Sequence, residues 1–274
     1  MRFASSLTRT PYYVLTGGLA IIFIFPLLWA GYASVAPQTN SGQTEGFGFG
    51  NYATLMDYNV GLPQFLLNST IVALLTVTLT LVTSVLGGYA FSRFSFPGKN
   101  ILFLLVLAVL MVPYATLLIP LYVLLAQIGL SNSLVGLSLV LTVFQLPFAT
   151  FMMRISFEAV PPELEESALI DGCSTFGALR RVLVPSVMPG IITVGLFAFL
   201  AAWNDFIAPL ILINDTSRLP LPVAVSTLAQ QGFGAIDYGV TEAGVVVLAI
   251  PCVVLFLVLQ RFYLRGFMSG ALKG

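Results

Sequence analysis

The sequence predicts an all-α membrane protein with six transmembrane helices and a long polar loop between the fourth and the fifth. Hydrophobic residues make up 58% of the 274 residues and charged residues 8%, whereas soluble domains carry about 25% charged residues. Because so few charges cannot cover a water-facing surface, we expect the chain to lie in a bilayer. Its length leaves room for about six helices of roughly 20 residues each plus their connections.

The composition also argues against several classes of function. The formal net charge is zero and there is no basic tail, so nucleic acid is not an expected partner. The chain has no histidine, which removes the commonest metal ligand and general base. Cys173 and Cys252 lie apart, one in a polar and one in an apolar segment, so no disulfide framework is expected. We expect no metal or cofactor site in this chain.

The first span is predicted at residues 12–36, behind Arg2 and Arg9. Two cations before an apolar stretch are also typical of a signal peptide, and Ala33 and Ala36 resemble a cleavage site. However, the stretch is longer than the usual hydrophobic region of about 7–15 residues, so a retained helix is favoured.

A polar, glycine-rich outer segment at 37–63 precedes the second, third and fourth spans, predicted at 64–91, 101–126 and 134–156. No charge occurs from residue 100 to residue 153, and the stretch at 127–132 is the natural turn within it. Pro113 and Pro120 are expected to bend the third span, because proline removes a helical hydrogen bond that neighbouring helices can replace in a bundle.

The fifth and sixth spans are predicted at 189–213 and 243–263. A polar loop joins them and contains Asp215, Arg218, Asp237 and Glu242. Placing the N-terminus in the cytoplasm puts ten basic residues inside and only Arg218 outside, which follows the positive-inside rule. The inside residues are Arg2, Arg9, Arg93, Lys99, Arg154, Arg180, Arg181, Arg261, Arg265 and Lys273. We therefore expect a multi-pass protein of the cytoplasmic membrane with both termini and the 161–189 loop in the cytoplasm.

The 161–189 loop has the sequence signals of two short helices. Pro161 and Pro162 suit a helix start, and the glutamates that follow lie at the positive end of its dipole. Gly172 suits the left-handed position after its last turn. Ser174 or Thr175 can cap a second helix in which three apolar residues share a face. They are Phe176, Leu179 and Leu183. Two interpretations remain open, an interfacial anchor and a docking element for a partner.

Residues 166–172, Glu-Ser-Ala-Leu-Ile-Asp-Gly, precede Val-Leu-Val-Pro at 182–185 by nine residues. This spaced pattern resembles the "EAA" coupling signature of integral membrane subunits of binding-protein-dependent ABC importers. That signature reads Glu-Ala-Ala, two residues, Asp-Gly, nine residues, then Ile-x-Leu-Pro. Ser167, Val182 and Val184 depart from it by small or conservative replacements.

The similarity extends to the carbohydrate branch that contains the second, maltose-type permease subunit. It rests on Asn68-Ser69, on 94–99 (Phe-Ser-Phe-Pro-Gly-Lys), on 202–205 (Ala-Trp-Asn-Asp) and on the ending at 269–274. The resemblance implies a type I importer permease with a cytoplasmic coupling-helix loop and three segments. They are an N-terminal tail, first helix and outer loop at 1–63, a type-1 permease core at 64–263 and a cytoplasmic tail at 264–274.

The resemblance also implies partners. These are a second permease subunit, a dimer of ATP-binding cassette ATPases and an extracytoplasmic solute-binding protein, with ATP and Mg²⁺ held by the ATPase. The chain itself has no Walker phosphate loop. By the same resemblance, three residues of the tail would contact the ATPase: Ser269, Gly270 and Lys273. The alternative is that the tail frays, as chain termini commonly do. The coupling positions would be Glu166, Ala168, Asp171, Gly172 and Pro185.

Asp205 is the one acidic residue inside a predicted span, and such residues raise a functional hypothesis. It is either part of the solute path, with Trp203 and Asn204, or a structural polar contact near the outer end. Trp203 is likewise either a stacking surface for a sugar or an interfacial residue. Because no span interior offers a buried lysine or arginine for an anionic substrate, a neutral or cationic sugar-like solute is expected. Phe144, Gln145, Tyr122 and Gln127 are assigned to bundle packing.

The alternatives are a secondary transporter driven by an ion gradient and a membrane enzyme. A secondary transporter needs ionisable relay residues in its spans, and Asp205 alone is a candidate. An enzyme is disfavoured by the absence of histidine and of clustered intramembrane acids. The sequence therefore favours a transport subunit whose energy comes from a separate ATPase.

Overall fold

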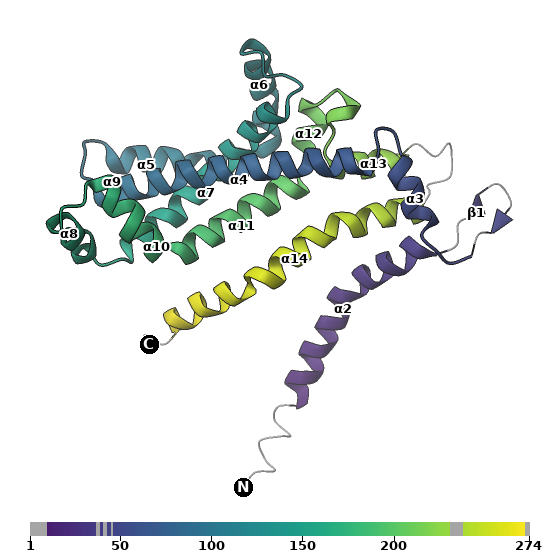
Figure 1. The fold of residues 1–274 in the computed structure, drawn as a ribbon, viewed down its shortest axis with the longest axis horizontal. Helices are drawn as coiled ribbons and strands as arrows, with labels where there is room; N and C mark the ends of the chain where they lie inside the picture. The colour runs from purple at the N-terminus through teal and green to yellow at the C-terminus, as the bar shows by residue number, and fades with distance from the viewer. Residues whose placement is uncertain (1–9, 37–38, 41–42, 45, 231–237, 272–274) are drawn as a thin grey trace, which may run out of the picture. The chain divides into compact units, whose positions relative to one another are not determined.

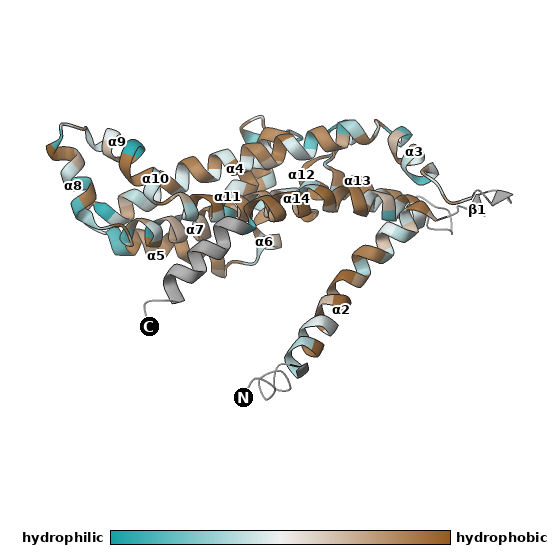
Figure 2. Cartoon of the chain, turned by 60° about the horizontal axis from the view of Figure 1, so that its bottom comes forward, coloured by the Kyte–Doolittle hydropathy of each residue, from teal (hydrophilic) through white to brown (hydrophobic). Residues whose placement is uncertain are grey.

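The structure is a computed structural model that describes residues 10–36, 39–40, 43–44, 46–230 and 238–271. Among these residues, four helices are each long and apolar enough to cross a membrane alone. They are α2 (Thr10–Val35), α4 (Leu62–Arg93), α7 (Leu134–Glu158) and α14 (Tyr238–Ala271). Two further candidate spans are each made of helices joined at a sharp bend, which gives up to six spans. Hydrophobic residues cover these helices, and hydrophilic ones are frequent around α8 and α9 (Figure 2). The predicted all-helical, six-span class is confirmed.

The third span breaks at its first proline. Helix α5 (Lys99–Ala108) runs into a 3₁₀ turn, η1 (Val109–Met111), and α6 (Tyr114–Gln127) leaves it at 106° (Figure 1). The break follows from Pro113, because a residue before proline is driven out of the helical region, and Val112 is extended at φ −85° and ψ 126°. Pro120, the second bend expected, lies inside α6.

The fifth span differs from the regular helix predicted at 189–213. Helix α11 (Met188–Asn204) ends at Asp205, and the short helix α12 (Ile207–Leu212) follows. Asp205 is extended at φ −67° and ψ 129°, and its carboxylate accepts a hydrogen bond from the Ala208 amide at 2.9 Å. The physical reason is that this side chain caps a new helix, which competes with continuing the old one.

The remaining elements form the connections. The outer segment after α2 contains the antiparallel pair β1 (Thr39–Asn40) and β2 (Gln43–Thr44), then α3 (Gly50–Asp57). The polar loop between α7 and α11 contains α8 (Pro162–Ile170), α9 (Thr175–Ala178), the π-helix η2 (Leu179–Leu183) and α10 (Val184–Ser186). The 3₁₀ turn η3 (Thr216–Arg218) and α13 (Leu221–Gln230) follow α12.

The chain forms two compact units. The first comprises Met1–Leu62 and Ala224–Ile250. Within it, the buried Asn51 side chain donates to the Ser34 carbonyl at 2.8 Å, and the Tyr52 hydroxyl donates to Ser34 Oγ at 2.9 Å. A Cβ on Gly239 would lie 2.6 Å from the Asn51 amide. These contacts fix the C-terminal end of α2 to α3 and to the start of α14.

The second unit, Pro63–Val223 and Pro251–Gly274, contains both bent spans and the polar loop. The N-terminal part of α4 is tied to the segment before α13 by the side chains of Asn68 and Ser69, the sequence pair that carried part of the resemblance. Asn68 Nδ2 donates to the Ser217 and Leu219 carbonyls at 2.9 and 3.0 Å. Ser69 Oγ accepts from the Leu221 amide at 2.8 Å.

Several predicted positions have no described side chain. Helix α14 continues to Ala271, beyond the end of the sixth span predicted at 263, so the backbones of Ser269 and Gly270 are helical. Lys273, Arg2 and Arg9 lie outside the described residues. The side chains of Arg261 and Arg265 also lie outside them. The expected contacts of the tail therefore stay predictions.

The close approach of α4 and α7 yields a stability prediction. A Cβ on Gly88 would lie 2.5 Å from Met153 Cβ and 2.8 Å from the Arg154 amide nitrogen. Gly88→Ala should therefore force the helices apart at a cost of about 1–3 kcal/mol. We expect a clearly lower midpoint of thermal unfolding for the purified protein.

Gly87→Ala is the matched control, since its Cβ would meet Thr150 Cγ2 at an ordinary 3.6 Å. Equal melting of the two variants would contradict the packing of α4 on α7.

Candidate functional site

The first helix of the polar loop ends as the sequence predicts. Gly172 has φ +87°, a left-handed conformation that glycine adopts without strain. Its amide donates to the Leu169 carbonyl at 3.1 Å, and the Cys173 amide donates to the Ala168 carbonyl at 3.0 Å. This pair of bonds is the Schellman motif that closes a helix C-terminus. The chain therefore reverses sharply at residues 171–173.

The second helix starts at the predicted cap and then widens. Ser174 Oγ accepts from the Gly177 amide at 3.2 Å. The π-helix at Leu179–Leu183 follows, a geometry that is rare and often found at functional sites. Leu179 and Leu183 are buried as expected, but Phe176 is 66% exposed and Ala178 takes the buried position. Phe176 and Leu179 line one groove with α4, where Phe176 stays open to the surface.

Glu165 attaches the loop to the end of α4. Its carboxylate accepts a hydrogen bond from the Tyr89 hydroxyl and lies 3.3 Å from Arg93 Nε. Arg93 Nη2 donates to the Val160 carbonyl at 2.6 Å, just before α8. The side chains of Arg93 and Glu165 are only 14% and 13% exposed. Removing one partner of a buried ion pair typically costs about 3–5 kcal/mol, so α8 is firmly held.

An apolar core packs against the second helical segment of the loop, which comprises α9, η2 and α10. Tyr89 packs its ring edge-on to Phe157, with centroids 5.7 Å apart. Met153, Leu179 and Leu183 belong to the same buried cluster. The loop, the inner end of α4 and the inner end of α7 therefore form one packed body.

The predicted coupling positions occupy two kinds of place. Glu166, Asp171, Gly172 and Pro185 are exposed, whereas Ala168 is buried. Between them, Ile170 is 86% exposed. The structure thus brings acidic groups and a large apolar side chain together on the free side of α8, and uses Ala168 for packing.

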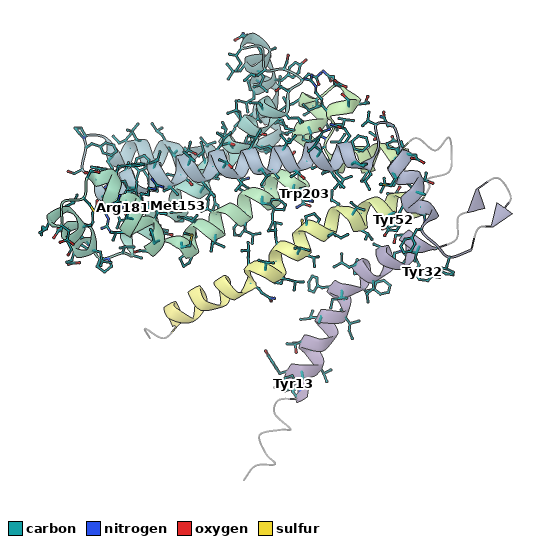
Figure 3. The ribbon with its side chains drawn as sticks, in the orientation of Figure 1. Tyr13, Tyr32, Tyr52, Met153, Arg181 and Trp203 are labelled. Carbon is teal, nitrogen blue, oxygen red and sulfur yellow. The ribbon has the colours of Figure 1, made fainter. Side chains whose placement is uncertain are left out.

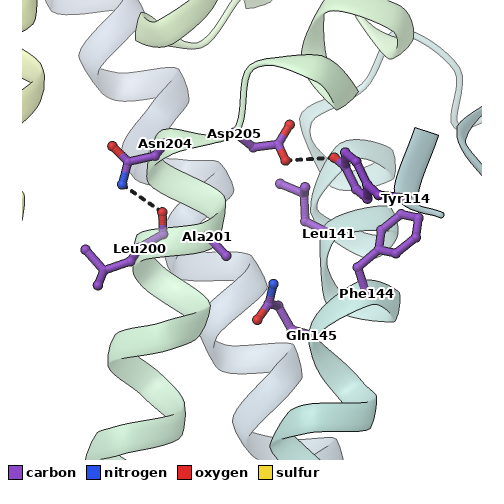
Figure 4. A pocket seen from close by; sticks show the side chains of 8 residues that line it. All are labelled: Tyr114, Leu141, Phe144, Gln145, Leu200, Ala201, Asn204 and Asp205. Carbon is purple, nitrogen blue, oxygen red and sulfur yellow. Dashed lines mark hydrogen bonds between the residues drawn. The ribbon is translucent and has the colours of Figure 1, made fainter. Parts of the chain in front are cut away.

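A cavity of about 300 Å³ lies between α6, α7 and α11 (Figure 4). Its polar lining residues are Tyr114, Gln145, Asn204 and Asp205. Its remaining walls are Leu141, Phe144, Leu200 and Ala201. A few convergent polar groups in an apolar hollow are typical of small-molecule sites.

The three residues predicted for the solute path have different surroundings in the structure. Asp205 Oδ2 accepts from the Tyr114 hydroxyl at 2.7 Å and Oδ1 caps α12, so both oxygens have structural partners. Asn204 lines the cavity and donates to the Leu200 carbonyl at 2.8 Å. Trp203 is 3% exposed and stacks on Phe199 with ring centroids 5.5 Å apart. Figure 3 shows Trp203 at the end of α11.

Sequence reasoning missed Tyr114 and assigned Phe144 and Gln145 to packing. Tyr114 follows Pro113 directly, and its ring packs edge-on to Phe144 at 4.5 Å between centroids. The signal available was Gln145 itself, an amide in the stretch from residue 100 to residue 153 that carries no charge. Its neighbours could not be inferred, because they depend on two breaks in different spans.

Hydrogen bonds link the loop after α12 to the turn before α7. Asn132 Oδ1 accepts from the amides of Asn214 and Asp215 at 2.9 and 3.1 Å, and Arg218 Nη1 donates to the Asn132 carbonyl at 2.7 Å. The Ser217 hydroxyl and then its amide lower the pKa of the Asp215 carboxyl. These bonds stabilise the turn at pH values above the ordinary pKa of aspartate. That stabilisation is lost as the pH falls through the lowered pKa of Asp215.

Among the residues that the structure describes, no group of three or more acidic or cysteine side chains is placed to hold a metal ion. The one free thiol in the loop, Cys173, is half-buried.

Comparison with known proteins gives close relatives. The permease protein SmoH of a sulfoquinovosyl glycerol transport system in Agrobacterium fabrum is 34% identical, over 92% of this chain and 89% of the relative. The permease protein SugB of a trehalose transport system in Mycobacterium tuberculosis is 30% identical, over 97% and 98%.

The fold also matches a solved structure. A bacterial ABC transporter involved in import of the acidic polysaccharide alginate has a chain that superposes with a TM-score of 0.81 at 18% identity, covering 96% of this chain and 99% of that one. Residues 81–265 match the family described as binding-protein-dependent transport system inner membrane component. This chain belongs to that family.

Proposed function

We propose that this chain is the permease subunit of an ATP-driven importer that carries a carbohydrate or sugar-like solute across the cytoplasmic membrane. The observation that carries the proposal is the polar loop at 161–189, called the coupling loop below. Its exposed acidic and apolar side chains belong to a segment that packs against α4 and α7. The sugar class is supported by relatives whose names specify trehalose and sulfoquinovosyl glycerol. A multi-pass transport subunit of this family is not itself an enzyme.

The partners follow from the same proposal. A separate ATPase dimer supplies ATP and Mg²⁺ and receives α8, a second permease subunit completes the pathway, and an extracytoplasmic binding protein delivers the solute. Ile170 would fill an apolar cleft on the ATPase, with Glu166 and Asp171 at the rim, because exposed apolar anchors ringed by polar groups are typical of interfaces. The tail residues Ser269, Gly270 and Lys273 are proposed as additional ATPase contacts.

Coupling requires that a displacement of α8 reach the transmembrane helices. The Glu165–Arg93 ion pair and the Tyr89 hydrogen bond join α8 to α4, and the buried cluster joins the second helix to α7. Packed bodies move as units rather than deforming continuously. Closure of the ATPase dimer would therefore tilt α4 and α7 together.

The cavity beside α11 is proposed as the solute path. Gln145 and Asn204 offer amide donors and acceptors for hydroxyl groups, and the Phe144 ring offers an apolar face for ring C–H groups. Asp205 supplies the only formal charge in the lining, which favours a neutral or cationic solute. An ion-gradient mechanism has no comparable support, because both Asp205 oxygens already have structural partners.

The proposed function is tested by uptake into vesicles that contain the assembled importer and its binding protein. We expect uptake to require ATP on the side of the membrane where the ATPase lies. Uptake should persist when ionophores collapse the proton and sodium gradients. Uptake that ionophores abolish while ATP remains would refute an ATP-driven importer.

The orientation is tested by thiol labelling in intact cells, in a background with Cys173 and Cys252 replaced by serine. A cysteine at the exposed Gly48 should react with an impermeant reagent, and one at the exposed Ile170 should react only after permeabilisation. The reverse pattern would place the loop outside and remove the coupling role.

The coupling role predicts a specific effect at Gly172. No atom lies within 4 Å of a Cβ built there, so Gly172→Val introduces backbone strain at φ +87° without a steric clash, at about 1–2 kcal/mol. We expect solute-stimulated ATP hydrolysis and uptake to fall together in the assembled importer.

Gly98→Val is the matched control, because Gly98 has φ +78° and equally open space but lies between α4 and α5. Equal losses of coupling in both variants would mean that strain alone, and not the loop, explains the effect.

The solute path predicts that Gln145→Leu raises the solute concentration for half-maximal uptake by about 3- to 10-fold, the usual worth of one hydrogen bond. Gln127→Leu, at the exposed end of α6, is the control and should leave that concentration unchanged. The path lies elsewhere if Gln145→Leu transports every accepted solute as the unmodified protein does.

A further inference from the structure

A second hollow in the chain, apart from the solute cavity, lies between α4 and the second helix of the coupling loop. It is an open groove of about 330 Å³. Helix α4 supplies an apolar wall between Leu81 and Leu86, and the loop supplies Phe176 and Val184. Arg180 is the only polar residue in the lining. The groove is thus a hydrocarbon surface with a single cation at its edge.

In the proposed membrane placement, the groove lies toward the loop end of α4, which is a candidate span. Leu86 precedes Arg93, the last residue of α4, by seven positions, which places it about 10 Å from the helix end. Val82 and Leu86 are 54% and 47% exposed within a candidate span. Those side chains therefore lie at the depth where acyl chains meet phospholipid headgroups, if α4 crosses the bilayer as proposed.

Arg180 lines the groove, and Arg181 follows it in the sequence. Arg93, Arg154 and Arg218 each form an ion pair. In the part of the chain that the structure describes, neither Arg180 nor Arg181 has a carboxylate within ion-pair distance, and both are exposed. An exposed arginine without an ion pair at an otherwise apolar groove complements a molecule with an anionic head and a hydrocarbon tail.

We propose that this groove binds an anionic phospholipid of the cytoplasmic leaflet, with an acyl chain along α4 and its phosphate on Arg180. A protein partner covering the groove would bury Arg180, and it would have to bring its own carboxylate to avoid an unpaired buried charge. A lipid supplies the phosphate at that depth without such a requirement. The proposal rests on the membrane placement proposed above.

The bound lipid would affect coupling only by occupying the groove between α4 and the loop. It fills the space between Leu81–Leu86 of α4 and Phe176 of α9, next to the 79° bend that joins the loop to α11. Filling that space stabilises the loop against α4 on a face that Glu165 does not reach. An importer in a membrane without anionic lipid should therefore show weaker solute-stimulated ATP hydrolysis.

The test uses the assembled importer in nanodiscs, with Phe176→Trp as a fluorescent reporter in a Trp29→Phe background and the Trp29→Phe parent subtracted. Phosphatidylglycerol or phosphatidylcholine with brominated acyl chains is titrated as quencher. We expect half-maximal quenching at a several-fold lower fraction of brominated phosphatidylglycerol than of brominated phosphatidylcholine. Arg180→Gln should remove this preference, and Lys99→Gln, a cation outside the groove, should keep it.

Native mass spectrometry of the importer without the reporter gives a second measurement, since Arg180→Gln should retain fewer phosphatidylglycerol adducts. Equal quenching by both lipids, or a preference unchanged by Arg180→Gln, would overturn the proposal. So would the absence of quenching by either lipid, because the groove would then be covered by another subunit. ATP-driven uptake in the same preparations is scored separately, so the lipid site and the proposed function can fail independently.

Discussion

The contact of Glu165 with Arg93 and Tyr89 is the constraint on which the proposed transmission of force depends. It joins a loop helix to the end of a 32-residue helix through charges that are mostly withdrawn from water. Such a pair contributes little net stability compared with apolar packing, but it is costly to break on one side. Its value here is geometric, since α8 cannot shift without either moving α4 or exposing Arg93. The apolar cluster around Phe157 and Leu183 gives the second helix the same dependence on α7.

A different polar contact organises the cavity. The break at Pro113 in the third span and the break at Asp205 in the fifth meet where the Tyr114 hydroxyl donates to the Asp205 carboxylate. Interrupted helices inside a membrane are tolerated only where freed backbone groups find partners or a cavity. Asp205 answers that need by capping α12, which leaves Asn204 and Gln145 to face the cavity. The carboxylate that drew attention in the sequence is therefore committed mainly to structure, and the amides beside it are better placed to meet a solute.

The sequence predicted the loop helices and the spans other than the fifth, because apolar length, proline and glycine act locally. Gly172 and Ser174 take the conformations that their neighbours require, whatever surrounds them. The long-range pairings were beyond reach. Glu165 was assigned to a helix dipole, since nothing in the sequence links it to Tyr89, 76 positions away. Likewise the π-turn at Leu179–Leu183 has no sequence signal, and the cavity depends on two breaks in different spans.

The most direct test of the account is a charge exchange between α4 and α8 in the assembled importer, read as solute-stimulated ATP hydrolysis. Glu165→Arg and Arg93→Glu each place two like charges in a site of 14% and 13% exposure, and each should lose stimulation. The double variant restores opposite charges and should recover a substantial part of it. Assembled single variants that keep full stimulation would contradict the claim that α8 drives the transmembrane helices through this contact.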